Sequence, residues 1–159
     1  MSAEVTNHRH FAVQIEPMRV RDLTGVLSIE KQSFPTPWSR YAFLTELLEN
    51  DKAYYFVART PAGKLVGYIG MWFIINDGHI TTIAVDPNYR GKGIGRQLLE
   101  TAEAVGRRHD MHRFTLEVRV SNKVAHELYR KMGFVDAGIR PGYYRDNNED
   151  AIIMWKELL

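Results

Sequence analysis

Residues 88–100, NYRGKGIGRQLLE, place three alternating glycines directly before a stretch with helical periodicity, and three cationic side chains lie among them. Glycine has no Cβ, so a backbone rich in glycine can approach an anion closely. The free N–H groups and the dipole at a helix N-terminus then favour negative charge. The stretch therefore predicts a phosphate-binding loop, although a solvated basic turn could have the same composition.

Two well-known phosphate loops do not fit these residues. A P-loop requires G-x-x-x-x-G-K-[ST], but Arg96 and Gln97 stand five and six positions after Gly91. A dinucleotide fingerprint requires G-x-G-x-x-G, and Arg96 again replaces the third glycine. The loop also lies in the middle of the chain and not at a first strand–helix turn. The pattern that remains is R-x-x-G-x-G, which begins at Arg90 and includes Gly93.

Two further side chains could take part in proton transfer, although each also has a structural interpretation. Alternation in LEVRV places Glu117 and Arg119 on one face of a strand, so Glu117 could be a solvent-facing carboxylate paired with Arg119. Tyr129 lies in HELYRKMGF, where it could be a core tyrosine with its hydroxyl at the edge. The residues alone leave both interpretations open.

The strands and helices that must position these residues alternate along the chain, and this order predicts an α/β (α+β) fold with a mixed sheet. We expect a loop at residues 76–79, which includes His79. Asp22, Ser39 and either Ser121 or Asn122 are candidate helix N-caps. The periodicity predicts strands at 13–20, 52–60, 65–75, 80–87, 113–120, 133–144 and 149–158, and helices at 21–34, 40–50, 94–109 and 121–134.

Length and composition limit the remaining possibilities. The chain has 159 residues, which predicts a flexible tail at 1–12 and one domain at 13–159. It has no cysteine, so disulfides, thiolate metal sites and a cysteine nucleophile are excluded, and a cytoplasmic location is expected. Arg130 stands where H-E-x-x-H needs its second histidine, and we expect no metal. A net charge of +2 and the lack of a long apolar run argue against nucleic-acid binding and membrane insertion.

The segment TTIAVDPNYRGKGIGRQLLE resembles the acetyl-CoA-binding motif of the GNAT N-acetyltransferases. Three other segments, IEKQSFPTPWSRYAFLTEL, LEVRVSNKVAHELYRKMGF and YYRDNNEDAIIM, resemble the RimI branch, the ribosomal protein alanine N-acetyltransferases. The resemblance runs from about residue 16 to residue 154. It implies the GNAT acyl-CoA N-acyltransferase fold, with a mixed central sheet of about seven strands and about four helices.

The resemblance also implies how acetyl-CoA would bind. Its pantetheine would pair with the backbone of Ile83, Ala84 and Val85, between two separated strands. Asn122 would touch the cofactor, although it could equally be a plain helix N-cap, and both roles are compatible. The residues expected to surround the pyrophosphate are Arg90, Gly91, Lys92, Gly93, Ile94, Gly95 and Arg96.

In the same family, Glu117 matches the proposed proton acceptor and Tyr129 the acid that protonates the coenzyme A thiolate. Without a cysteine to form an acetyl-enzyme, direct attack of the amine in a ternary complex is favoured. An α-amine, with a pKa of about 7.7–8.0, needs less help from a base than lysine, with a pKa of about 10.4.

The resemblance places Trp38, Tyr143 and Tyr144 near the acceptor. As neighbours on a strand, the two tyrosines should face opposite ways, and which one faces the peptide is open. Glu149 and Asp150 could attract a cationic N-terminus, but they are interpreted as turn residues. We expect acetyl transfer to the α-amine of an N-terminal alanine, in a small-subunit ribosomal protein. The alternatives are other protein N-termini, lysine, small amines, or a non-catalytic acetyl-CoA-binding module.

Overall fold

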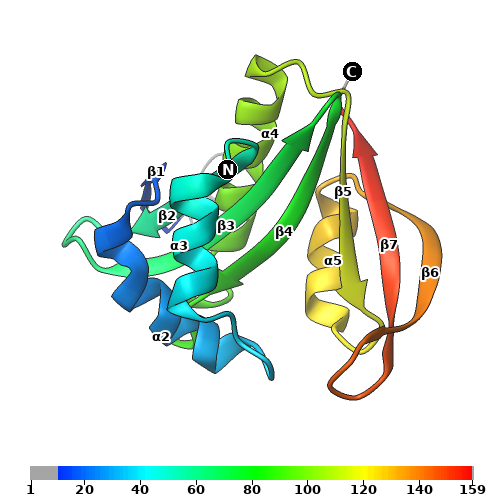
Figure 1. Ribbon diagram of the computed structural model, residues 1–159, viewed down its shortest axis with the longest axis horizontal. Helices are drawn as coiled ribbons and strands as arrows, with labels where there is room; N and C mark the ends of the chain where they lie inside the picture. Colours follow the sequence, from blue (N-terminus) through cyan, green and yellow to red (C-terminus); the bar gives the residue numbers. More distant parts are fainter. Residues whose placement is uncertain (1–10, 159) are drawn as a thin grey trace, which may run out of the picture.

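A computed structural model describes residues 11–158, in which seven strands form one sheet (Figure 1). The order across the sheet is β1-β2-β3-β4-β5-β7-β6, and only β4 and β5 run parallel as neighbours. The mixed sheet and the order of elements predicted from the sequence are confirmed. The strands are β1 (Gln14–Pro17), β2 (Ala53–Arg59), β3 (Leu65–Ile74), β4 (Asp77–Val85), β5 (Arg113–Arg119), β6 (Val135–Tyr144) and β7 (Glu149–Glu157).

Four α-helices cover the two faces of this sheet. They are α2 (Leu23–Ser33), α3 (Arg40–Glu49), α4 (Ile94–Arg108) and α5 (Lys123–Lys131), and two short 3-10 helices, η1 (Val20–Asp22) and η2 (Pro87–Tyr89), precede α2 and α4. In Figure 1, α2 and α3 lie in front of the sheet, whereas α4 and α5 lie behind it. Each pair buries its apolar side against the sheet, which gives two hydrophobic clusters, one on each face.

Two of the predicted helix caps are formed by side chains, and one is not. Ser39 Oγ accepts the backbone N–H of Ala42 at 3.2 Å. Asn122 Oδ1 accepts the N–H of Ala125 at the same distance. Asp22 occupies the N-cap position of α2, but its side chain makes no capping bond to that helix. It accepts the N–H of Arg19 and pairs with a guanidinium on β2, so a contact distant in sequence replaces the predicted cap.

Strands β4 and β5 stay together for only three residue pairs. The last pair is His79 with Thr115, and beyond it the two strands diverge (Figure 1). The register between β3 and β4 also shifts after Gly70, so Thr81 has no opposing residue. An irregular β4 that separates from β5 leaves room for a ligand between two strands of one sheet.

The start of β4 corrects the predicted loop at 76–79. The strand already begins at Asp77, so His79 belongs to the sheet. Gly78 fits there because an ideal Cβ would lie 2.2 Å from the Phe114 ring, which fills the space above it. Most of the expected flexible tail at 1–12 falls on residues 1–10, which lie outside the described residues. The described part of the chain begins at Phe11, whose carbonyl accepts a hydrogen bond from Gln97 Nε2 on α4 at 2.9 Å.

Candidate active site

A cavity of about 560 Å³ occupies the space between the separated ends of β4 and β5. Its walls also include the segment after α2, the start of α5 and the end of β6. The cavity therefore brings together side chains and backbone from both halves of the sheet. Among the predicted site residues, those that line it are Trp38, Ile83, Glu117, Asn122, Tyr129 and Tyr144.

Glu117 lies on β5 with its side chain only 12% exposed. Its Oε1 lies 3.2 Å from Nε2 of His79, a residue that the sequence analysis assigned to a loop. Burial acts to raise the pKa of Glu117, but hydrogen bonding and charge from His79 and the charge of Arg140 outweigh it, so the pKa is lowered. Glu117 is therefore ionised at neutral pH. The alternative pairing with Arg119 does not occur.

Tyr129 is 7% exposed and packs against Phe134, with ring centroids 6.0 Å apart. Within residues 11–158 its hydroxyl makes no hydrogen bond, and no side-chain polar atom there is both fully buried and unpartnered. The hydroxyl must therefore reach the cavity that Tyr129 lines. Burial, and secondarily Tyr144, raises the pKa of Tyr129, so the side chain remains protonated at neutral pH. Such a group can donate a proton into the cavity.

Tyr143 and Tyr144 do not face opposite ways as predicted. Their rings meet edge to face, with centroids 5.0 Å apart. The register of β6 is irregular between Arg140 and Tyr144, and Gly142 has a φ of 60°. This departure from regular alternation brings both rings to the same region. Tyr144 lines the cavity, while burial and the neighbouring Glu117 carboxylate raise the pKa of Tyr143.

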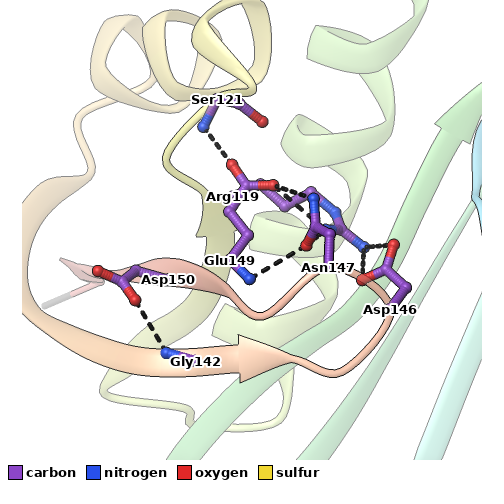
Figure 2. A network of polar contacts seen from close by, with 7 residues as sticks. All are labelled: Arg119, Ser121, Gly142, Asp146, Asn147, Glu149 and Asp150. Atoms are coloured by element: carbon purple, nitrogen blue, oxygen red, sulfur yellow. Dashed lines mark hydrogen bonds and ion pairs between the residues drawn. The ribbon is translucent and has the colours of Figure 1, made fainter.

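A polar network around Arg119 fixes the turn between β6 and β7 against the end of β5 (Figure 2). Arg119 Nη2 contacts both carboxylate oxygens of Asp146 at 3.0 Å, and its guanidinium lies 4.0 Å from the centroid of the Tyr144 ring. Glu149 accepts the N–H of Ser121 at 2.7 Å and also contacts Arg119. The network thus orients Tyr144 over the cavity.

Both acidic residues that follow this turn make hydrogen bonds within the protein. Hydrogen bonding from Ser121 lowers the pKa of Glu149 to about 2. Asp150 Oδ1 accepts the N–H of Gly142 at 2.8 Å, in the irregular part of β6 (Figure 2). Both residues begin β7, directly after the turn to which the sequence analysis assigned them, and their contacts are structural.

The segment between α2 and α3 forms the opposite wall of the cavity. The buried carboxylate of Glu30 accepts the backbone N–H of Trp38 at 2.9 Å and the hydroxyl of Tyr68. The Trp38 ring also packs on Phe43, with centroids 5.2 Å apart. Glu30 thus holds this wall in place, a role that the sequence analysis did not identify.

The glycine loop has the backbone expected of an anion cradle. Gly91 and Gly93 have φ angles of 77° and 84°, in the left-handed region that disfavours other residues. Gly93 is the N-cap of α4 and supplies no side-chain cap, so within residues 11–158 no side chain caps the first N–H groups of the helix. A Cβ at Gly91 would meet nothing within 4 Å, which leaves space beside the loop. These features fit the diphosphate of a coenzyme A thioester.

The three cations of the loop are less free than the sequence suggested. Arg90 donates to the carbonyl of Val85 at 3.0 Å and to Ser33 Oγ at 3.1 Å. Lys92 lies over the Phe11 ring, 5.5 Å from its centroid. Arg96 pairs with Glu100, one turn further along α4, at 3.4 Å. The backbone of the loop, more than its side chains, is arranged to receive phosphate.

The edge of β4 next to the cavity is open. Ile83, Ala84 and Val85 pair with β3 on one side. On the other side, β5 has already diverged, and no other strand in residues 11–158 pairs with this edge. Backbone groups on this edge could hydrogen-bond to an extended amide-containing ligand. The predicted contact with pantetheine is compatible with this geometry.

Two other features of residues 11–158 bear on the expectations. No group of three or more His, Asp or Glu side chains is placed to hold a metal ion there. None of the helices in this part is both long enough and apolar enough to cross a membrane.

Comparison with known proteins agrees with this geometry. The model of the acetyltransferase (GNAT) family matches residues 23–134. The chain is 45% identical to the "Putative ribosomal protein bS18-alanine N-acetyltransferase" of Bacillus subtilis, over 89% of this chain and 93% of that protein. It is 34% identical to the ribosomal protein bS18-alanine N-acetyltransferase of Escherichia coli, over 88% and 94%.

The crystal structure of the ribosomal-protein-S18-alanine N-acetyltransferase from Escherichia coli has a TM-score of 0.84 to this fold, with 32% identity. The match covers 92% of this chain and 94% of that one. The resemblance to the RimI branch and the expected fold are thereby confirmed. Acetyl-CoA is the acetyl donor in this family. The chain belongs to the acetyltransferase (GNAT) family and is an N-acetyltransferase.

Proposed function

We propose that the protein transfers the acetyl group of acetyl-CoA to the α-amine of an N-terminal alanine, in the small-subunit ribosomal protein bS18. The observation that carries this proposal is that Glu117 and Tyr129 line one cavity between β4 and β5, and that the glycine loop follows the C-terminal end of β4. The names of the relatives in Bacillus subtilis and Escherichia coli support the choice of acceptor. A ribosomal acceptor also implies action in the cytoplasm.

Each residue has a defined part in this reaction. Gly91, Gly93 and the start of α4 hold the diphosphate, and the open edge of β4 holds the pantetheine. The neutral amine attacks the thioester carbonyl, which forms the C–N bond, and the C–S bond then breaks. Glu117 takes the extra proton from the attacking nitrogen, and Tyr129 gives its proton to the departing sulfur. Transfer of a proton from Glu117 to Tyr129 restores both groups. Neither a metal ion nor a nucleic acid is required.

The lowered pKa of Glu117 limits what this carboxylate can do. It is too weak a base to hold an α-ammonium group largely deprotonated before attack. An α-amine with a pKa of about 7.7–8.0 is already neutral in about a tenth of molecules at pH 7. We therefore assign Glu117 the proton that becomes acidic as the C–N bond forms. A lysine side chain, with a pKa of about 10.4, would have far fewer neutral molecules at the same pH.

The decisive test is an acetyl-CoA assay on a matched pair of peptides. One peptide carries the N-terminal sequence of bS18 with a free alanine and an internal lysine, and the other is the same peptide with a blocked N-terminus. We expect transfer to the first to exceed transfer to the second at least 100-fold. Equal rates would reject the α-amine as acceptor, and binding of acetyl-CoA without transfer to any amine would favour a non-catalytic module.

Glu117→Gln provides the internal control for the assignment of the base. Glutamine keeps the shape of the side chain but cannot accept the proton, so turnover should fall about 100-fold or more. Affinity for acetyl-CoA, measured by calorimetry, should stay within about twofold. A variant with normal turnover across pH would remove Glu117 from the mechanism.

A further inference from the structure

We infer that His79 is a positioning residue for this reaction, because it holds one oxygen of Glu117 and leaves the other oxygen to face the substrate amine. This inference rests on the proposed function. The contact joins two strands at the point where they separate, since His79 and Thr115 form the last pair between β4 and β5. Glu117 follows two residues later on β5, on the same side of the strand as Thr115.

Both ring nitrogens of His79 have a partner on β5. Nε2 lies 3.2 Å from Glu117 Oε1, and Nδ1 lies 3.0 Å from Thr115 Oγ1. An ionised carboxylate can only accept, so the proton of the first contact belongs to Nε2. The Thr115 hydroxyl can donate to or accept from Nδ1, so it satisfies both the neutral and the charged ring. The ring orientation, and with it the Nε2–H donor, is therefore fixed.

The ring of His79 stands between the reacting cavity and a second hollow. The hollow has a volume of about 530 Å³ and is open to solvent, and Glu117 lines the main cavity but not this hollow. The His79 side chain is 30% exposed, compared with 12% for Glu117. His79 thus shields one side of the carboxylate from water while its own ring remains accessible. The residues that line the hollow are Ile74, Ile75, Asn76, Asp77, His79 and His112.

Other charged groups near this pair come from each neighbouring element. The charge of Arg140 on β6 also lowers the pKa of Glu117, and so does a hydrogen bond with Tyr143 on the same strand. On the side of the hollow, Asp77 is paired with Arg113 at 3.2 Å. The ring centroids of Trp72, on β3, and His79 lie 6.4 Å apart. In the described residues, His79 is the group that forms an ion pair with a Glu117 oxygen.

The consequence can be measured on Glu117 itself. A hydrogen bond from His79 stabilises the ionised form, so its removal should raise the pKa of Glu117 by about one unit. Loss of the fixed orientation should lower kcat about tenfold, whereas the KM for acetyl-CoA should not change. A role confined to stability would lower the melting temperature but would move neither the pKa nor the ratio of kcat to KM.

The experiment is a ¹³C NMR titration of glutamate side-chain carboxyls, in which Glu117→Gln identifies the Glu117 resonance. We expect His79→Ala to raise the pKa of Glu117 by about one unit. His79→Gln places an amide N–H near the former Nε2, so it should restore at least half of this shift and of kcat. His112→Ala, which changes the same hollow without contact to Glu117, is the matched control and should leave the pKa unchanged.

Circular dichroism of each variant establishes that it is folded, and Thr115→Val provides a second route if His79→Ala does not fold. Valine keeps the shape of Thr115 but frees the Nδ1 side of the ring, so the pKa of Glu117 should rise by a smaller amount. The inference would be overturned if the pKa of Glu117 stayed constant in a folded His79→Ala or Thr115→Val variant. Equal losses of kcat in His79→Ala and His79→Gln would also overturn it. Failure of the wild-type protein to acetylate an alanine peptide would reject the proposed function, whereas the titration would still decide the contact.

Discussion

Tyr129→Phe separates the proton that the hydroxyl supplies from the packing of the ring. The ring lies against Phe134 and only 7% of the residue is exposed, so phenylalanine should occupy the same space. The hydroxyl has no hydrogen-bond partner within residues 11–158, so its removal breaks no contact there. We therefore expect the free energy of unfolding to change by less than about 1 kcal/mol.

The effect on turnover should be much larger than the effect on stability. Loss of a general acid typically lowers a rate by about 10² to 10⁴, so kcat should fall at least about 100-fold, or about 2.7 kcal/mol in the barrier. The need for an acid also depends on pH. The thiol of cysteine has a pKa of about 8.5, and as pH rises through and beyond this range a departing alkyl thiolate needs a proton less. The deficit of the variant should therefore shrink as pH rises from 7 to 9.5.

The assay follows release of free thiol from acetyl-CoA with the alanine peptide at saturating concentrations of both substrates. Tyr54→Phe is the matched control, because Tyr54 lies among aromatic rings of the core, 4.5 Å from Phe73, and does not line the cavity. An unchanged kcat in Tyr129→Phe would refute the role of this hydroxyl. A loss of the same size at every pH from 7 to 9.5 would refute proton donation to the sulfur as its cause.

Three further experiments test the glycine loop, the turn between β6 and β7, and the burial of Tyr129. Gly93→Glu should abolish acetyl-CoA binding in calorimetry, because it places a carboxylate among the N–H groups of α4. Gly63→Glu is the control for backbone strain, since Gly63 has a φ of 93° and open space around it, and this variant should bind normally. The pKa of Glu149 is lowered to about 2, so the stability that Glu149 contributes is present above about pH 4.5 and is lost as pH falls toward 2. In an acid titration, Glu149→Gln should lack this loss of stability. Identical acid unfolding of the wild type and the variant would exclude the contribution. Burial raises the pKa of Tyr129, so the stability that this residue contributes is complete below about pH 10 and is lost above it. Above pH 10 the free energy of unfolding, measured by chemical denaturation at each pH, should therefore fall less steeply with pH in Tyr129→Phe, by about 1.4 kcal/mol per pH unit. An equal dependence on pH in both proteins would contradict this.

Local patterns were sufficient to predict most of the fold. Ser39 and Asn122 cap the helices that follow them because a cap depends on residues three positions apart. Gly93 begins α4 for a similar reason, since the left-handed turn and the apolar periodicity after it are both written in adjacent residues. Glu117 and Tyr129 were identified through the family resemblance, and the structure places both on the same cavity.

The features that sequence reasoning missed depend on residues far apart in the chain. A glycine before His79 indicated a loop, but Gly78 belongs to the strand because the Phe114 ring lies directly above it. Alternation predicted that Tyr143 and Tyr144 would face opposite ways, which requires a regular strand, and β6 is irregular there. The β-branched residues at 80–83 predict a strand from Ile80, but nothing local extends it to His79, whose contact with Glu117 requires the pairing of β4 with β5.

The most direct test of the central claim compares the N-terminal peptide of bS18 by mass spectrometry in cells with and without this gene. The account predicts that the N-terminal alanine carries an acetyl group when the gene is present and a free α-amine when it is absent. Reintroduction of the wild-type gene should restore the acetyl group, and reintroduction of the gene with Tyr129→Phe should restore much less. An N-terminus of bS18 with the same acetylation in both strains would contradict the account.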